Sequence, residues 1–215
     1  MGTQDEQASS AQAPGNEEPG NEEAASQEPV DLTGVALTTG RLILKAMEPS
    51  DIDAVTEICQ DPEIQKWTTV PSPYTRADAE SFINEFAPAG RAAGTDVVFG
   101  LYHATTGKLL GAVGLHDIAP ADANLSAQAE IGYWLAADER GNGYIVEAVQ
   151  AVCRWAFAEL KLDRIEWTAF LPNETSREVA KRIGFTMEGT VRSKHVHRGK
   201  LVDAWIGSLL PSDKV

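Results

Sequence analysis

The stretch DERGNGYIVEAVQAVCRWAF, residues 138–157, places an arginine and two glycines directly before a run with apolar residues at helical spacing. Glycine inside a helix costs about 1 kcal/mol relative to alanine, so it is expected where the backbone bends sharply or is closely approached. The first N–H groups of a helix lack partners within the helix and carry partial positive charge. We therefore expect an anion, such as a phosphate group, to bind this turn, with Arg140 adding a cation at its mouth. The apolar face of the expected helix consists of Ile145, Ala148, Val149, Val152, Ala156, Phe157 and Leu160.

The two glycines also have a second explanation, because a left-handed turn before a helix requires glycine without any ligand. Two common nucleotide sites are excluded. A Walker site needs Gly-Lys-Ser/Thr, which the sequence lacks. A dinucleotide-binding fingerprint needs a third glycine where the chain has Val146. The stretch alone leaves an anion-binding turn and a purely structural turn open.

The N-terminal part of the chain has a composition unlike the rest. Residues 1–40 contain eight acidic residues and no basic one, and are rich in Gly, Pro, Ala, Gln and Ser. Such a segment buries too little apolar area to offset the entropy lost on ordering. We expect a disordered acidic tail over 1–36 and one folded domain over 37–211, out of 215 residues in all.

Charge and hydrophobicity exclude several classes of function. The net charge of −14 argues against a nucleic-acid binder with a broad basic face. No run of 18 apolar residues indicates a transmembrane helix, and no secretory signal is visible. The two cysteines lie far apart, which favours free thiols in a reducing compartment. We expect a cytoplasmic protein without a membrane or nucleic-acid partner.

The pattern of apolar residues predicts an α/β domain. We expect a strand, two helices, three strands, a helix, a strand, a helix and two strands, in that order. This order favours one domain with a mixed, largely antiparallel sheet. The expected strands span 41–47, 96–104, 109–118, 127–136, 164–171, 186–196 and 200–210, and the expected helices span 50–61, 74–87, 144–160 and 173–185.

Five pieces of the sequence, one of which contains the glycine turn, occur in the order found in a known family: GRLILKAMEPSD, VPSPYTRADAESFI, AEIGYWLAADERGNGYIVEAV, CRWAFAELKLDRIEWTAFLPNETSREVAKRIGF and EGTVR. Together they resemble the GNAT superfamily of acyl-CoA-dependent N-acetyltransferases, and most nearly its RimJ/RimL-like ribosomal-protein-alanine branch. The resemblance covers roughly residues 37–210. It implies a twisted sheet with one splayed pair of strands and with helices on both faces.

The resemblance also implies acetyl-CoA as co-substrate. In the family, the strand that corresponds to EIGYWLA splays from its neighbour and pairs with the pantetheine arm. The residue Ile145 departs from the alanine or glycine that the family prefers, but a backbone contact does not use its side chain. Asn173 is expected to reach the pantetheine end, or else only to cap its helix. The implied cofactor contacts are Tyr133, Trp134 and Leu135 for pantetheine, and the N–H groups of Arg140, Gly141, Asn142, Gly143, Tyr144 and Ile145 for pyrophosphate.

The transfer itself needs an acid for the leaving thiolate and a base for the amine. Many members of the family place a tyrosine acid where this chain has Ala180. The RimL-like branch resembles this chain in having Ser176 instead, whose hydroxyl is expected to donate to the leaving sulfur, unless it is only a surface or capping serine. Glu130, on the splayed strand, and His195, where the branch has a glutamate, are alternative bases. We prefer Glu130, because its strand is set by the stronger motif. His197 shares a strand face with His195, but no third ligand is apparent, so no metal is expected.

The acceptor end is less defined by the sequence. In this branch the loop KWTTVPSPYT helps to wall the acceptor site, which gives Trp67, Pro73 and Tyr74 as expected contacts, although a proline loop that only packs aromatic residues is the alternative. The acidic balance suits a cationic amine such as a protein N-terminus, an amino acid, a polyamine or an aminated antibiotic. We expect direct transfer in a ternary complex by a monomer or homodimer. A catalytically silent acyl-CoA-binding module is the alternative function.

Overall fold

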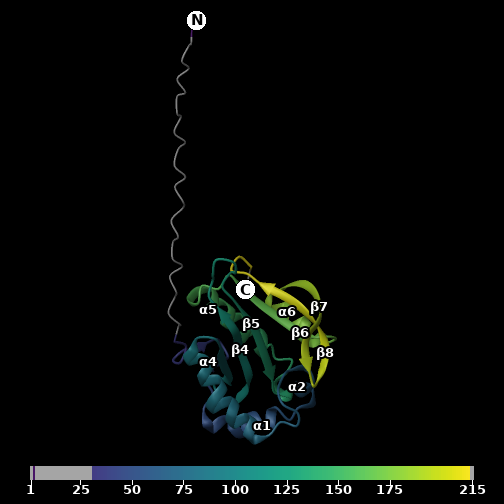
Figure 1. Ribbon diagram of the computed structural model, residues 1–215. Helices are drawn as coiled ribbons and strands as arrows, with labels where there is room; N and C mark the ends of the chain where they lie inside the picture. The colour runs from purple at the N-terminus through teal and green to yellow at the C-terminus, as the bar shows by residue number, and fades with distance from the viewer. Residues whose placement is uncertain (1, 3–30, 214–215) are drawn as a thin grey trace.

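The structure, a computed structural model, describes residue 2 and residues 31–213 of the chain. Eight strands form one mixed sheet in the order β1-β2-β3-β4-β5-β6-β8-β7 (Figure 1). All neighbouring strands are antiparallel except β5 and β6, which are parallel. The predicted α/β domain with a mostly antiparallel sheet is therefore confirmed. The strands are β1 Leu37–Thr38, β2 Leu42–Lys45, β3 Val97–His103, β4 Leu109–Ala119, β5 Gln128–Leu135, β6 Arg164–Phe170, β7 Thr186–His197 and β8 Lys200–Leu209.

Helices cover both faces of this sheet. Successive side chains of a strand point to opposite faces, and on both faces they are buried against helices. In β3, Phe99 and Leu101 belong to the core cluster that includes α5 and α6 residues. Val98 and Tyr102 belong to the clusters that include α1, α3 and α4 residues on the other face. The helical elements are η1 Pro49–Asp51, α1 Ile52–Ile58, α2 Pro62–Trp67, α3 Arg76–Ser81, η2 Phe82–Phe86, α4 Ala87–Ala93, η3 Ala137–Glu139, α5 Tyr144–Glu159 and α6 Glu174–Ile183.

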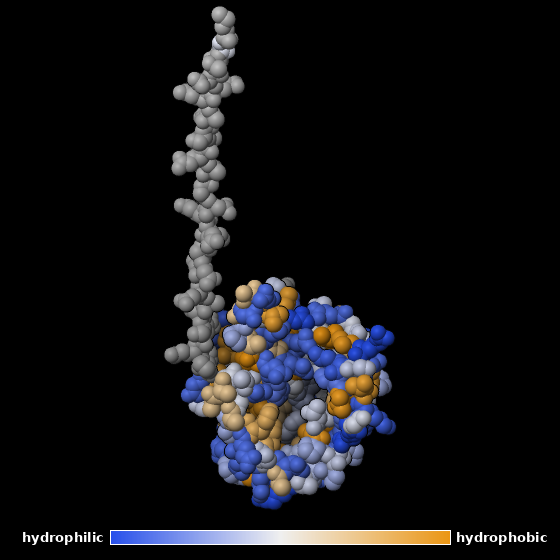
Figure 2. Space-filling view, viewed as in Figure 1, coloured by the Kyte–Doolittle hydropathy of each residue, from blue (hydrophilic) through white to orange (hydrophobic). Residues whose placement is uncertain are grey.

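The parallel pair β5 and β6 separates part of the way along its length. Their register runs from Gln128 opposite Arg164 to Ile131 opposite Trp167 and then stops. Beyond that point β5 stays paired with β4, while β6 stays paired with β8. Because each strand follows a different neighbour, the two diverge, and Figure 2 shows the molecule hollowed between the centre of the sheet and the β7–β8 hairpin. The expected splayed pair is thus present.

Two helical regions differ in extent from the sequence prediction. Helix α2 was not predicted, since six residues are too few to show a 3.6-residue period. It begins at Pro62 behind the cap Asp61, whose side chain accepts from Glu63 N at 2.8 Å. The second predicted helix ends later than expected. It continues through the π-helical turn η2 into α4 and stops only at Gly94, which adopts a left-handed φ of 71°.

The expected boundary of the acidic tail at residue 36 also needs correction. Residues 1 and 3–30 lie outside the described part of the chain. Within the described part, however, Leu32 is only 1% exposed and belongs to the main core cluster. Its N–H donates to Arg91 O at 3.2 Å, and its carbonyl accepts from the buried Arg91 guanidinium at 2.8 Å. A single leucine in a polar segment shows no periodicity, so composition alone misses this anchor.

In the described residues, no helix is both long enough and apolar enough to cross a membrane.

We expect Leu32→Ala to lower the free energy of unfolding by about 2–5 kcal/mol, because truncation of a buried leucine leaves a cavity. Leu125 is 59% exposed, so Leu125→Ala makes the same chemical change at the surface and is expected to shift stability by about 0.5 kcal/mol or less. Urea unfolding measures both variants. Equal stability of the two would show that Leu32 does not belong to the core.

Candidate functional site

The N-terminus of α5 presents an open turn of unpaired backbone N–H groups. Gly141 and Gly143 adopt left-handed φ values of 84° and 77°, which only glycine adopts without strain. The first helical hydrogen bond joins Glu147 N to Gly143 O at 3.1 Å, and within residues 31–213 none of the N–H groups of residues 141–146 has a protein acceptor. A Cβ at Gly141 would meet no atom within 4 Å. Such a turn can hold an anion.

The side chain of Ile145 lies away from this opening. It is 8% exposed and belongs to the main core cluster, so the turn offers a ligand only its backbone N–H. The core therefore accommodates the bulkier residue, and the opening of the turn stays clear of its side chain.

Arg140 lies differently from the expectation that it stands at the mouth of the turn. Its guanidinium pairs with the Asp61 carboxylate and donates to Leu135 O at 3.1 Å. Its own N–H donates to Ala137 O at 3.4 Å. The side chain therefore ties the end of β5 to the start of α2, and the free N–H groups begin at Gly141.

The cation at the turn is instead Arg41, just before β2, which the sequence analysis did not assign to the site. Its Nη1 donates to Asn142 O at 2.9 Å, its Nη2 lies 2.6 Å from Glu147 Oε2, and its guanidinium lies 4.7 Å from the Tyr144 ring centre. Burial raises the pKa of Glu147, but hydrogen bonds from Thr39 and Arg41 outweigh it and lower that pKa overall. The only sequence signal was that Arg41 is the first basic residue of the chain.

Past the point of divergence, β5 carries the three residues expected to contact pantetheine. Tyr133, Trp134 and Leu135 pair with β4 on one side and have no strand partner on the β6 side. Tyr133 packs against the core on the α5 face, whereas Trp134 packs on the face of α1–α4. The free backbone edge can accept an extended chain.

Ser176, the expected acid, lies in a hydrogen-bonded cluster on the α5 face. Its hydroxyl lies 3.1 Å from Tyr133 Oη and accepts from Trp167 Nε1 at 3.2 Å. Burial, partly offset by hydrogen bonds with Ser176 and Trp167, raises the pKa of Tyr133 to about 12. The Ser176 N–H donates to Asn173 Oδ1 at 3.1 Å, so Asn173 caps α6. The cluster joins the divergent edge of β5 to the first turn of α6.

The two expected bases lie in a second cluster on the opposite face of the sheet. Thr168 Oγ1 donates to Glu130 Oε1 at 2.6 Å and lies 3.2 Å from His195 Nε2. The ring of His195 packs edge-on against Phe170, with ring centres 5.3 Å apart. The structure therefore brings Glu130 and His195 together through Thr168, a residue that the sequence analysis missed. Its contacts depend on the register of β6 against β5 and on the position of His195 on β7. Local sequence patterns encode neither of these.

The residues of the expected acceptor loop have different degrees of exposure. Trp67 is partly buried and its Nε1 donates to Glu63 at 2.8 Å, while Pro73 is exposed. Tyr74 is only 4% exposed and belongs to the core cluster of α1 and α3, so it supports the loop from below. Arg198, at the turn between β7 and β8, donates to Gln65 O and joins that hairpin to α2. The hairpin turn therefore contacts α2, the helix that leads into the loop.

Neither a metal cluster nor an activated thiol is found in the described residues. No group of three or more His, Cys, Asp or Glu side chains is placed there to hold a metal ion. Cys59 and Cys153 are both free and buried, and burial raises the pKa of each thiol to about 12. Thiols with such a pKa are protonated at neutral pH and are poor nucleophiles.

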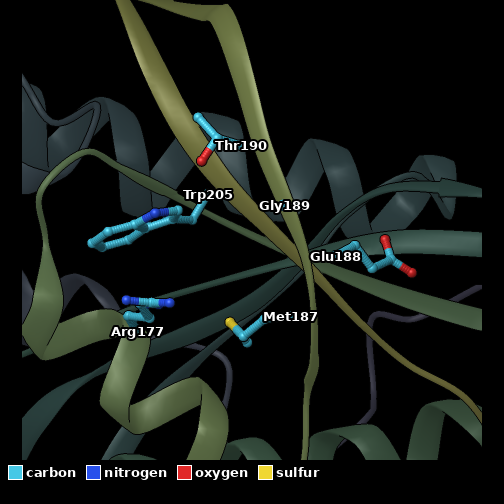
Figure 3. A pocket seen from close by; sticks show the side chains of 6 residues that line it. All are labelled: Arg177, Met187, Glu188, Gly189, Thr190 and Trp205. Atoms are coloured by element: carbon cyan, nitrogen blue, oxygen red, sulfur yellow. The ribbon is translucent and has the colours of Figure 1, made fainter.

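A separate pocket of about 290 Å³ lies between α6, β7 and β8 (Figure 3). The Arg177 guanidinium stacks 4.6 Å from the Trp205 ring centre, while Glu188 points to the other side of β7 and pairs with Arg164 at 2.6 Å. This pocket contains none of the residues assigned from the sequence. Its lining is completed by Met187, Gly189 and Thr190.

Comparisons with known proteins agree with this geometry. A family model described as an acetyltransferase (GNAT) domain matches residues 41–186. The chain is 31% identical over 178 residues to the uncharacterized N-acetyltransferase p20 of Bacillus licheniformis, covering 81% of this chain and 95% of that protein. It is 31% identical over 156 residues to the putative ribosomal N-acetyltransferase YdaF of Bacillus subtilis, covering 70% and 81%. The solved structure of the microcin C7 self-immunity acetyltransferase MccE, in complex with acetyl-CoA and AMP, superimposes with a TM-score of 0.73 at 22% identity, covering 84% and 98%.

We expect Asn173→Ala to destabilise the protein by about 0.5–2 kcal/mol, because it removes the cap of α6. Asn173→Asp keeps a side-chain acceptor for the Ser176 N–H and is expected to retain most of the stability. Thermal unfolding of the two variants compares them. An alanine variant as stable as the unchanged protein would contradict a capping role.

Proposed function

The chain belongs to the GNAT acetyltransferase family, and on this premise we propose that it transfers the acetyl group of acetyl-CoA to a primary amine by direct attack in a ternary complex. The observation that carries the proposal is the divergence of β5 from β6 beside a turn of free N–H groups. Together they offer one continuous path for an extended thioester with a phosphorylated end.

The turn before α5 suits the pyrophosphate of CoA. Its open backbone N–H groups and helix dipole attract an anion, and Arg41, paired with Glu147, holds the shape of the turn by donating to Asn142 O. The free edge of β5 suits the pantetheine arm, whose amides can pair with the outward-facing backbone groups of Tyr133 and Leu135 as a strand would. The backbone of Trp134 between them faces β4. The complex of MccE with acetyl-CoA, a protein of the same fold, supports this assignment.

The Ser176 cluster suits protonation of the leaving thiolate. Trp167 Nε1 already donates to the serine oxygen, so the single Ser176 proton is free to go to Tyr133 or to a ligand. The buried Tyr133 hydroxyl remains protonated at neutral pH and can return a proton to Ser176. Both cysteines are buried and their pKa values are raised, so neither thiol is suited to form an acetyl-enzyme, which supports direct attack.

The opposite cluster suits the acceptor amine. Glu130 and Glu166 stand side by side in the register of β5 and β6. Glu166 pairs with Arg164 and Lys194, each at 3.4 Å. Glu130 is therefore the carboxylate offered to an incoming ammonium group. Trp67 and Pro73 are the accessible expected contacts from the acceptor loop. The name of YdaF supports a protein N-terminus among the candidate amines. The oligomeric state and a cytoplasmic location stay predictions from the sequence.

The test of this function is release of the CoA thiol from acetyl-CoA with a panel of amines, followed with a thiol reagent. The panel contains peptides with ribosomal-protein N-termini, free amino acids, polyamines and aminoglycosides. At least one class is expected to raise CoA release above the rate without amine. Tight acetyl-CoA binding with no release for any amine would instead favour a silent acyl-CoA-binding module.

We expect Gly143→Val to weaken acetyl-CoA binding strongly, because a branched side chain at this left-handed position crowds the pyrophosphate and distorts the turn. Gly199 has a similar φ of 73° at the distant β7–β8 turn, so Gly199→Val introduces the same strain elsewhere. Calorimetric titration with acetyl-CoA, beside circular dichroism for folding, compares the two. Near-normal affinity in a folded Gly143 variant would show that this turn is not the phosphate site.

A further inference from the structure

The contacts of Thr168 determine where the proton of His195 lies. A threonine hydroxyl donates one hydrogen bond only, and an ionised carboxylate only accepts. The shorter contact, 2.6 Å to Glu130 Oε1, therefore takes the Thr168 proton. The Thr168 oxygen can then only accept from His195 Nε2 at 3.2 Å. This places the N–H of neutral His195 on Nε2 and leaves the lone pair on Nδ1, for which the described residues offer no hydrogen-bond partner.

We propose that Thr168 couples Glu130 to His195 in one relay, in which His195 Nδ1 takes a proton from the ammonium form of the acceptor amine. Thr168 is then a positioning residue, and Glu130 stabilises the imidazolium through it rather than acting as the base itself. This inference rests on the proposed acetyl transfer and names the group that prepares the amine. In a catalytic triad a carboxylate binds and orients the histidine directly. Here the Thr168 hydroxyl lies between the carboxylate and the histidine.

The proton balance of the transfer fits one base and one acid. The acceptor ammonium loses a first proton to His195 Nδ1, which makes the nitrogen nucleophilic. The new C–N bond forms as the C–S bond of the thioester breaks. After attack the second amine proton passes to water. The departing thiolate takes the Ser176 proton, which Tyr133 and then solvent replace, so one proton is released overall. His195 then releases its proton to water, so the ring is neutral again for the next cycle.

The surroundings of His195 keep the ring neutral enough to accept this proton. The charged groups that act on it are Glu130 on β5, Glu166 on β6 and Lys194 on β7, and His197 packs against the same Phe170 ring. Burial lowers the pKa of His195 and Lys194 acts in the same direction, while Glu130 and Glu166 oppose them; the net result lies below the ordinary histidine value. Without the Thr168 link the imidazolium loses an acceptor, so its pKa should fall further.

The rival explanation is that Glu130 alone is the base and that Thr168 merely holds the strands together. The two differ in the tautomer and titration of His195, which nuclear magnetic resonance reads without turnover. Long-range proton–nitrogen spectra of the full chain with ¹⁵N-labelled histidine report both, and His195→Gln assigns the signal among the four histidines. The relay predicts the Nε2–H tautomer.

Variants at Thr168 give the decisive comparison. In Thr168→Val the tautomer preference should disappear and the titration midpoint of His195 should fall by about one pH unit. Thr168→Ser keeps the hydroxyl and should retain both. Thr190→Val, at an exposed threonine of β7, is the matched control and should change neither. An Nδ1–H tautomer in the unchanged protein, or an unshifted or raised midpoint in Thr168→Val, would overturn the relay.

Glu130→Gln tests the direction of the coupling. It should lower the midpoint more in the unchanged background than once Thr168 is valine, because only the direct Coulomb attraction of Glu130 remains in the valine variant. With an amine found by CoA release, Thr168→Val should lower kcat at least about tenfold at unchanged acetyl-CoA affinity, with Thr168→Ser near normal. If His195 shows the coupled titration but no amine releases CoA, the coupling is supported, and the proposed function fails together with the role as base.

Discussion

The divergence of β5 from β6 after Ile131 and Trp167 is the constraint on which the rest of the molecule depends. A strand edge left unpaired inside a sheet exposes N–H and C=O groups that need partners. The fold tolerates the gap because each strand keeps its other neighbour, β4 for β5 and β8 for β6. What enters the gap must therefore supply backbone-like hydrogen bonds, which is the chemistry of a pantetheine arm.

Side chains alternate between the two faces along β5 and β6, so the two hydrogen-bonded clusters lie on opposite faces of the sheet. Trp167 and Tyr133 reach Ser176 on the α5 face, whereas Thr168 and Glu130 reach His195 on the face of α1–α4. Because neighbouring residues of a strand point to opposite faces, one residue step along β6 moves from the Ser176 cluster to the Thr168 cluster. A thioester held between the strands would have its leaving sulfur and its attacking amine served from opposite sides.

Local patterns in the sequence predict those features that one segment determines by itself. The paired glycines, the apolar face of α5 and the order of elements were all readable, because turn geometry and helical period are local properties. Leu32, Arg41 and Thr168 were not, since each acts through a partner more than 35 residues away, namely Arg91, Glu147 and Glu130. Arg140 was assigned to the wrong position for the same reason. Its charge was visible in the sequence, but its pairing with Asp61 depends on the placement of α2.

The most direct test of this account is hydrogen–deuterium exchange of the full chain with and without acetyl-CoA. The account predicts slower exchange at Tyr133 and Leu135 on the free edge of β5 and at residues 141–146 in the turn before α5, because these N–H groups gain acceptors from the cofactor. The hairpin turn at residues 105–108 should remain unchanged. Binding of acetyl-CoA that protects the pocket around Arg177 and Trp205 instead, and leaves both segments unaltered, would contradict the account.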